Sequence, residues 1–119
     1  MRHTSKDETT YVKDLKEKLS DSVKKREWER FHNPQDLAES IGIEAAELRQ
    51  IFQWISKKEA LEYRTKSEKM KKIGEELADV LIYLLNLSNV MELDISQVIE
   101  DKIEVNEKKY PADKYKSKF

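Results

Sequence analysis

The stretch from Glu76 to Leu87 constrains the fold of this chain most strongly, because it is apolar yet carries acids. After Glu76, its only strongly polar residues are Asp79 and Asn86. Residues three, four and seven apart share a helix face, so Glu76, Asp79, Tyr83 and Asn86 would form one polar stripe. An isolated carboxylate in an apolar interior must be neutralised, paired or bound to a metal. The stretch therefore predicts a buried helix with a polar seam that needs a partner.

The rest of the composition favours helices and excludes several classes of protein. The chain is 38% apolar and 39% charged, with only two glycines and two prolines, which is typical of long helices with solvated faces. A net charge of −1 gives no bulk attraction to nucleic acid or to an anionic membrane. The absence of cysteine excludes disulfides, catalytic thiols and thiolate metal sites.

No segment of the sequence has the pattern of a signal core or of a membrane span. The first residues are polar, and the longest apolar run is far short of the ~20 residues that a spanning helix needs. We therefore expect a cytoplasmic protein whose partners include neither a nucleic acid polymer nor a membrane.

Apolar spacing and capping residues predict an all-α fold. We expect an antiparallel bundle of about four main helices, over residues 10–25, 34–56, 65–91 and from 94 to a point before Pro111. Asn33 before Pro34 is a helix-start signal, and capping boxes begin at Thr65 and Asp94. Pro111 should end the last helix. The whole chain, 1–119, is expected to be a single domain, with residues 1–9 and 112–119 as mobile tails.

A second acidic pair, Glu44 and Glu47, lies among apolar residues of the expected second helix. Acids three apart are common in a chain with 24 of them, so only this apolar context separates the two pairs from the solvated ones. If the second and third helices pack antiparallel, four carboxylates meet across one seam. Hard divalent cations such as Mg²⁺ would relieve the repulsion. The alternative is that Lys or Arg side chains neutralise the acids.

Zinc or di-iron is disfavoured, because di-iron bundles use Glu-x-x-His motifs and neither His3 nor His32 follows an acid by three on a buried face. Trp28 and Phe31, in the connector before the second helix, either stack on a flat ligand or close the core. His32 is either a hydrogen-bonded structural residue or a contact to base or phosphate.

The ordered set of motifs resembles the MazG-like superfamily of all-α nucleoside triphosphate pyrophosphohydrolases, and most closely its dCTP pyrophosphatase branch. The likeness runs from about residue 11 to 116. Four segments carry it: Arg26-Glu27-Trp28-Glu29-Arg30-Phe31-His32-Asn33-Pro34, Glu44-Ala45-Ala46-Glu47-Leu48 with Phe52-Gln53-Trp54, Glu75-Glu76-Leu77-Ala78-Asp79-Val80-Leu81-Ile82-Tyr83-Leu84, and residues 106–111. In one departure, Leu19 stands where that branch has a histidine, nine residues before Trp28.

The resemblance implies Mg²⁺-dependent hydrolysis of a nucleoside triphosphate to the monophosphate and pyrophosphate. It also implies roles for individual residues and assembly as a homodimer or homotetramer with sites near subunit interfaces. By the family pattern, the metal is held by Glu44, Glu47, Glu76 and Asp79. The nucleotide site is lined by Trp28, His32, Trp54 and Tyr83. The phosphate contacts are Lys102, Asn106 and Lys109, which could equally be a solvated helix end.

Residue chemistry agrees with such a reaction, since phosphoanhydride cleavage needs mainly positioning and charge stabilisation. Glu47 is the expected catalytic residue, accepting the proton of the attacking water. We expect dCTP or a modified pyrimidine deoxynucleotide as substrate. Two alternatives stay open: the same chemistry on dUTP or phosphoribosyl-ATP, and a non-enzymatic helical interaction module with tryptophans in its core.

Overall fold

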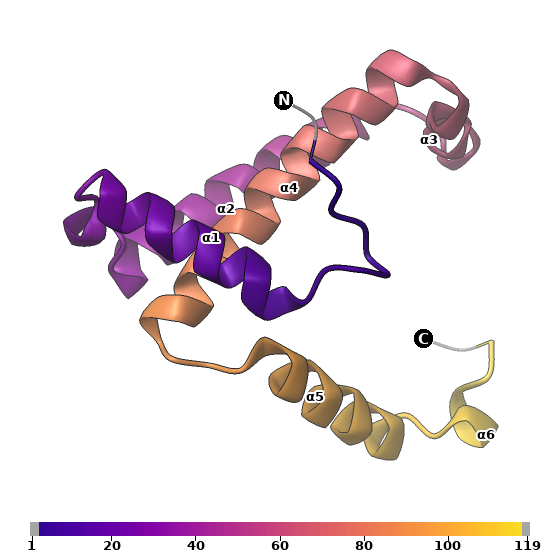
Figure 1. Ribbon diagram of the computed structural model, residues 1–119. Coiled ribbons are helices and arrows are strands. Elements are labelled where there is room, and N and C mark those ends of the chain that lie inside the picture. Colours follow the sequence, from indigo (N-terminus) through magenta and orange to yellow (C-terminus); the bar gives the residue numbers. More distant parts are fainter. Residues whose placement is uncertain (1–2, 118–119) are drawn as a thin grey trace.

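The computed structural model describes residues 3–117, and every regular element within them is helical (Figure 1). This confirms the all-α class. The expected four main helices correspond to the four long ones, but the count was wrong, because two further short α-helices are present. The helices are α1 Val12–Lys25, α2 Pro34–Ile51, α3 Lys57–Glu62, α4 Ser67–Val90, α5 Ile95–Lys109 and α6 Ala112–Tyr115, with 3₁₀ turns η1 Glu29–Phe31 and η2 Tyr63–Thr65.

The second helix is shorter than the periodicity predicted, ending at Ile51 and not near Ser56. Trp54 has a φ of 64°, in the left-handed region that a helix excludes. The Ser56 hydroxyl then accepts a hydrogen bond from the Glu59 amide at 3.0 Å and starts α3. A turn and a new cap therefore interrupt an apolar pattern that would otherwise continue.

Two of the three predicted helix starts are confirmed by their hydrogen bonds. The Asn33 side chain accepts from the Asp36 amide at 2.9 Å, and Asp94 accepts from the Gln97 amide at 3.0 Å. The capping box at Thr65 was wrong. Thr65 lies in η2 and donates its hydroxyl to the Glu62 carbonyl at 2.9 Å, so α4 begins at Ser67 without a side-chain cap.

Within residues 3–117, α4 is the centre of the packed part of the chain. α2 runs along one side of it and α1 crosses it, whereas α5 and α6 lie apart (Figure 1). The Lys16 ammonium donates to the Leu93 carbonyl at 2.7 Å, and the Asn89 amide donates to the Lys16 carbonyl at 3.0 Å. These two bonds tie α1 to the last turn of α4 and to the connector that follows it. The single chain is thus an α1–α2–α4 unit with α5 projecting from it.

The packed unit has a small core. Leu37 on α2 and Tyr63 in η2 are the only buried apolar side chains among the described residues, at 1% and 8% exposure. No helix described here combines the length and apolarity that crossing a bilayer requires. Of the expected tails, α6 occupies residues 112–115, while residues 1–2 and 118–119 lie outside the described part.

Candidate metal centre and adjoining cavity

Three carboxylates meet where α2 packs against α4. Glu44 and Glu47 lie one turn apart on α2, and Glu76 faces them from α4. One oxygen from each lies within 4.8 Å of the others. The three-residue spacing puts both α2 acids on one face, and helix packing supplies the third. The cluster therefore follows from the two helices that form the main contact of the fold.

The acids of this cluster are incompletely satisfied by the protein. Glu76 is 5% exposed, Glu44 is half-buried and Glu47 is exposed. Oε2 of Glu44 and Oε2 of Glu76 are buried without a hydrogen-bond partner. Lys72, one turn before Glu76, places Nζ 2.8 Å from Glu76 Oε1. The one cation beside the cluster thus bonds to a single acid, and two buried oxygens have no donor among residues 3–117.

These contacts shift the pKa values of three groups. The approach of the Glu76 carboxyl, and then the charge of Glu44, raises the pKa of Glu47 above its usual range. The hydrogen bond from Lys72 lowers the pKa of Glu76, although burial opposes the shift. The same bond raises the pKa of Lys72. Glu76 is therefore held as the carboxylate, and Glu47 is the acid that experiences the repulsion.

This donor set fits a hard divalent cation. Carboxylate oxygens are the ligands that Mg²⁺ and similar ions prefer, and a cation would satisfy both orphaned oxygens. Three acids from two rigid helices could thus bind a metal, as the sequence pattern suggested. Neutralisation by Lys72, the alternative, covers only one oxygen of Glu76.

Asp79, the fourth predicted metal ligand, is exposed and lies one turn beyond Glu76 on α4, outside this cluster. It lines an adjoining cavity of about 420 Å³ between α4, α1 and the connector. Trp28 and Phe31 contribute aromatic walls from the connector, and Tyr83 and Asn86 continue the α4 face. The polar stripe predicted on this helix thus runs from the acid cluster into the cavity.

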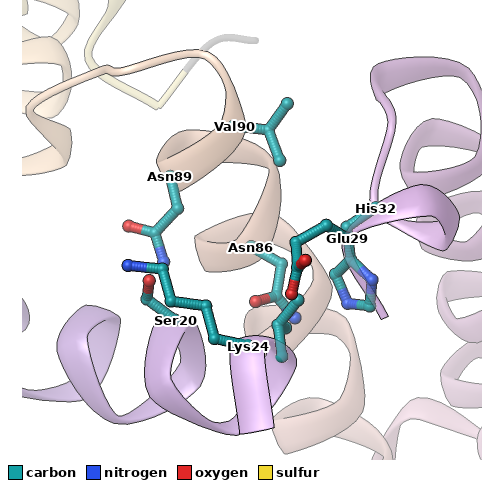
Figure 2. Close-up of a pocket in the computed structure, with 8 residues that line it drawn as sticks. Ser20, Lys24, Glu29, His32, Asn86, Asn89 and Val90 are labelled. Carbon is teal, nitrogen blue, oxygen red and sulfur yellow. The ribbon is translucent and has the colours of Figure 1, made fainter. Parts of the chain in front are cut away.

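A smaller cavity of about 170 Å³ shares Val23, His32 and Asn86 with the first one. Figure 2 shows the Asn86 side chain projecting from α4 into the space between α1, which carries Lys24, and the segment of Glu29 and His32. His32 Nδ1 lies 3.1 Å from the Trp28 carbonyl. Because a carbonyl only accepts, Nδ1 carries the hydrogen, and Nε2 is left for other contacts.

The other predicted site residues lie elsewhere in the chain. Trp54 is 96% exposed in the turn after α2 and lines neither cavity. Lys102, Asn106 and Lys109 lie on α5, all exposed, and α5 does not pack beside the acid cluster. Sequence reasoning missed Lys72 and Ser40, the latter a lining residue of the larger cavity. The i, i+4 spacing of Lys72 and Glu76 was the available signal for the first.

Comparison with known proteins assigns the family of this architecture. The family model of the MazG-like family matches residues 39–118, about two thirds of the chain. This chain belongs to the MazG-like family. The matched region begins inside α2, before Glu44, and so contains the whole acid cluster.

Individual relatives agree with this assignment. The chain is 32% identical over 101 residues to dCTP pyrophosphatase 1 of Mus musculus and 31% identical to that of Homo sapiens. Each alignment covers 85% of this chain but only 59% of the relative, so the chain spans about three fifths of their length. It also resembles the crystal structure of a pyrophosphatase from Archaeoglobus fulgidus, with 38% identity and a TM-score of 0.78, over 93% of this chain and 98% of that one.

Proposed function

We propose that this protein is a Mg²⁺-dependent nucleoside triphosphate pyrophosphohydrolase acting on dCTP or a modified pyrimidine deoxynucleotide in the cytoplasm. One observation carries the proposal: three carboxylates from α2 and α4 place oxygens within 4.8 Å of one another, and two of the acids have a buried oxygen that no donor of residues 3–117 reaches. The names of the relatives, dCTP pyrophosphatase and pyrophosphatase, support this reaction class.

In this proposal Glu44, Glu47 and Glu76 hold the cation, and Asp79 joins them from the rim of the cavity. A bound Mg²⁺ supplies positive charge for the triphosphate oxygens and activates water. The water oxygen would bond to one phosphorus of the α,β-anhydride, the bond from that phosphorus to the bridging oxygen would break, and the bridging oxygen would leave with the electron pair on the other phosphate group. Glu47, the most exposed acid of the cluster, accepts the proton of the water.

The nucleoside would occupy the 420 Å³ cavity beside Asp79. Its volume falls within the usual range of small-molecule sites, and Trp28 gives it a flat wall on which a base can stack. Tyr83 lies on the α4 face between Asp79 and Asn86, and His32 closes the cavity from the connector. This arrangement would put the base on one side of Asp79 and the phosphates on the other.

We further propose that the functional form is a homodimer or a homotetramer. The radius of gyration is 17.4 Å, whereas a compact chain of this length has about 13.5 Å. The accessible surface is 10607 Å², against about 6,700 Å² for a folded monomer of this mass. The difference exceeds a standard interface of roughly 1,600 Å².

The face left uncovered supports the same conclusion. Met70, Leu77, Leu81 and Leu84 are exposed and share one face of α4, away from the polar stripe. A second copy is a suitable cover for such a stripe. In an assembly, Lys102, Asn106 and Lys109 of α5 could reach the triphosphate bound to a neighbouring copy, which their distance from the acids in one chain does not allow.

A panel assay tests the proposal. Purified chain with Mg²⁺ is incubated with dCTP, modified dCTP, dUTP and phosphoribosyl-ATP, and both monophosphate and pyrophosphate are quantified. We expect equal amounts of the two products, most rapidly from dCTP or its modified form, and no turnover by Glu47→Gln. Glu39→Gln, on the same helix but outside the cluster, is the matched control. Orthophosphate as the product, or no turnover of any nucleotide, would reject the proposal.

A non-enzymatic interaction module is the second candidate, because Lys72 does pair with Glu76. Calorimetry with Mg²⁺ and a non-hydrolysable nucleotide separates the two candidates. Heat from both ligands supports the enzyme, whereas heat from neither supports the module.

A further inference from the structure

Asn86 is a largely buried residue whose side-chain amide opens onto the cavities beside α4. It is 6% exposed, yet its side chain makes no hydrogen bond within residues 3–117. Its polar neighbours on α4 are satisfied: the Ser88 hydroxyl donates to the Leu85 carbonyl at 2.7 Å, and the Asn89 amide donates to the Lys16 carbonyl at 3.0 Å. Neither side-chain atom of Asn86 is among the fully buried atoms that lack a partner, so the amide is open to the cavities that it lines and can bond to a ligand there.

The surroundings of Asn86 fit a planar partner. The side chain lines the larger cavity, whose walls include Trp28 and Phe31. It also lines the smaller cavity drawn in Figure 2, where Lys24 and Glu29 are the charged residues around it. Asp79 and Asn86 lie on the same α4 face, seven residues apart, which is about 10 Å along the axis. A nucleotide whose phosphates lie near the acid cluster would extend its base in this direction.

We propose that Asn86 hydrogen-bonds to the edge of the nucleobase and is one of the specificity-determining residues of this site. The inference rests on the proposed nucleotide hydrolysis. The amide oxygen accepts a hydrogen from the 4-amino group of cytosine, and the amide nitrogen donates to N3 of the ring. Rotation of the amide by half a turn exchanges its oxygen and nitrogen and would suit uracil equally. Asn86 therefore selects a base with an adjacent donor and acceptor. Other residues separate cytosine from uracil.

A base that lacks one of these groups leaves half of the buried amide unpaired, which a site of this kind rejects. Replacing the 4-amino group of cytosine by hydrogen gives such a base, 2-pyrimidinone. The nucleotide of this base has the same ring, sugar and triphosphate as the cytosine nucleotide. The difference in affinity between the two nucleotides therefore isolates the contact made by the amide.

Calorimetry with Mg²⁺ and nucleotides carrying an α,β-imido group, which resists hydrolysis, tests the inference on the full chain. Wild-type protein should bind the cytosine nucleotide about tenfold more tightly than its 2-pyrimidinone counterpart. In Asn86→Leu the two affinities should agree within about twofold, while the affinity for inorganic tripolyphosphate is unchanged. Asn89→Leu, which loses the satisfied amide one turn on, should keep the tenfold preference.

Three results would overturn the inference. Equal affinity of wild-type protein for the two nucleotides would exclude a contact to the amino group, and this comparison needs no variant. A tenfold preference that persists in Asn86→Leu would assign the contact to another residue. Equal loss of nucleotide and tripolyphosphate binding in Asn86→Leu would make Asn86 structural. Because binding is measured without turnover, failure of hydrolysis in the panel assay remains a separate result.

Discussion

Truncation of Leu81 should weaken self-association while leaving the chain folded. Leu81 is 48% exposed in the centre of the apolar stripe on α4. Full burial of a leucine side chain contributes about 1.5–3 kcal/mol, so the exposed half has roughly 1 kcal/mol still to gain. An interface with twofold symmetry contains this side chain twice, which gives about 2 kcal/mol for Leu81→Ala. The dissociation constant should then rise by about 30-fold.

Sedimentation velocity over a concentration series measures this change. Leu61→Ala is the matched control, because Leu61 is 61% exposed on α3 and lies off the stripe. Circular dichroism checks that both variants keep their helix content. If Leu81→Ala assembled with the wild-type dissociation constant, or if the wild-type chain were monomeric at every concentration, the assignment of this stripe to a subunit interface would be wrong.

Three other substitutions test separate parts of the account. Asp79→Asn should nearly abolish pyrophosphate release and leave helix content and assembly intact, since it removes a carboxylate from an exposed position; wild-type turnover at saturating Mg²⁺ would exclude Asp79 as a ligand. Trp54 is 96% exposed, so Trp54→Ala should leave the melting temperature unchanged. It should raise the nucleotide dissociation constant more than it slows the chemical step, because we expect assembly to bring Trp54 to the nucleotide of a neighbouring copy; an unchanged dissociation constant would exclude that contact. Lys72→Met should lower the melting temperature of the metal-free protein and tighten Mg²⁺ binding severalfold by calorimetry, because Lys72 holds the oxygen of Glu76 that a cation would take; unchanged affinity would show that Lys72 does not compete.

Local features of the sequence predicted much of this fold. Asn33 and Asp94 cap helices because their side chains reach an amide three residues on, which depends only on near neighbours. The pairs Glu44/Glu47 and Glu76/Asp79 could be distinguished from acid pairs on solvated helix faces because apolar residues surround them in the sequence. Spacing then placed Glu44 and Glu47 on one face, and only the packing of α2 on α4 had to be assumed to bring in Glu76.

Features that depend on tertiary contacts were not predictable in this way. The left-handed Trp54 ends an apolar periodicity that gives no sign of stopping. The sequence pattern of α5 is that of an ordinary amphipathic helix, which would be expected to pack on the bundle. It projects because the other helices form no extensive contact with it. The unpaired amide of Asn86 is likewise visible only when its neighbours are in place, although its position on the polar stripe was clear from the sequence.

Anomalous diffraction from crystals soaked with Mn²⁺, which takes similar oxygen ligands, tests the central claim most directly. The account predicts a peak bounded by Glu44, Glu47 and Glu76, with the Lys72 ammonium displaced from Glu76. Crystals that showed no peak there, with Lys72 still bound to Glu76, would contradict the claim that these carboxylates form a metal centre.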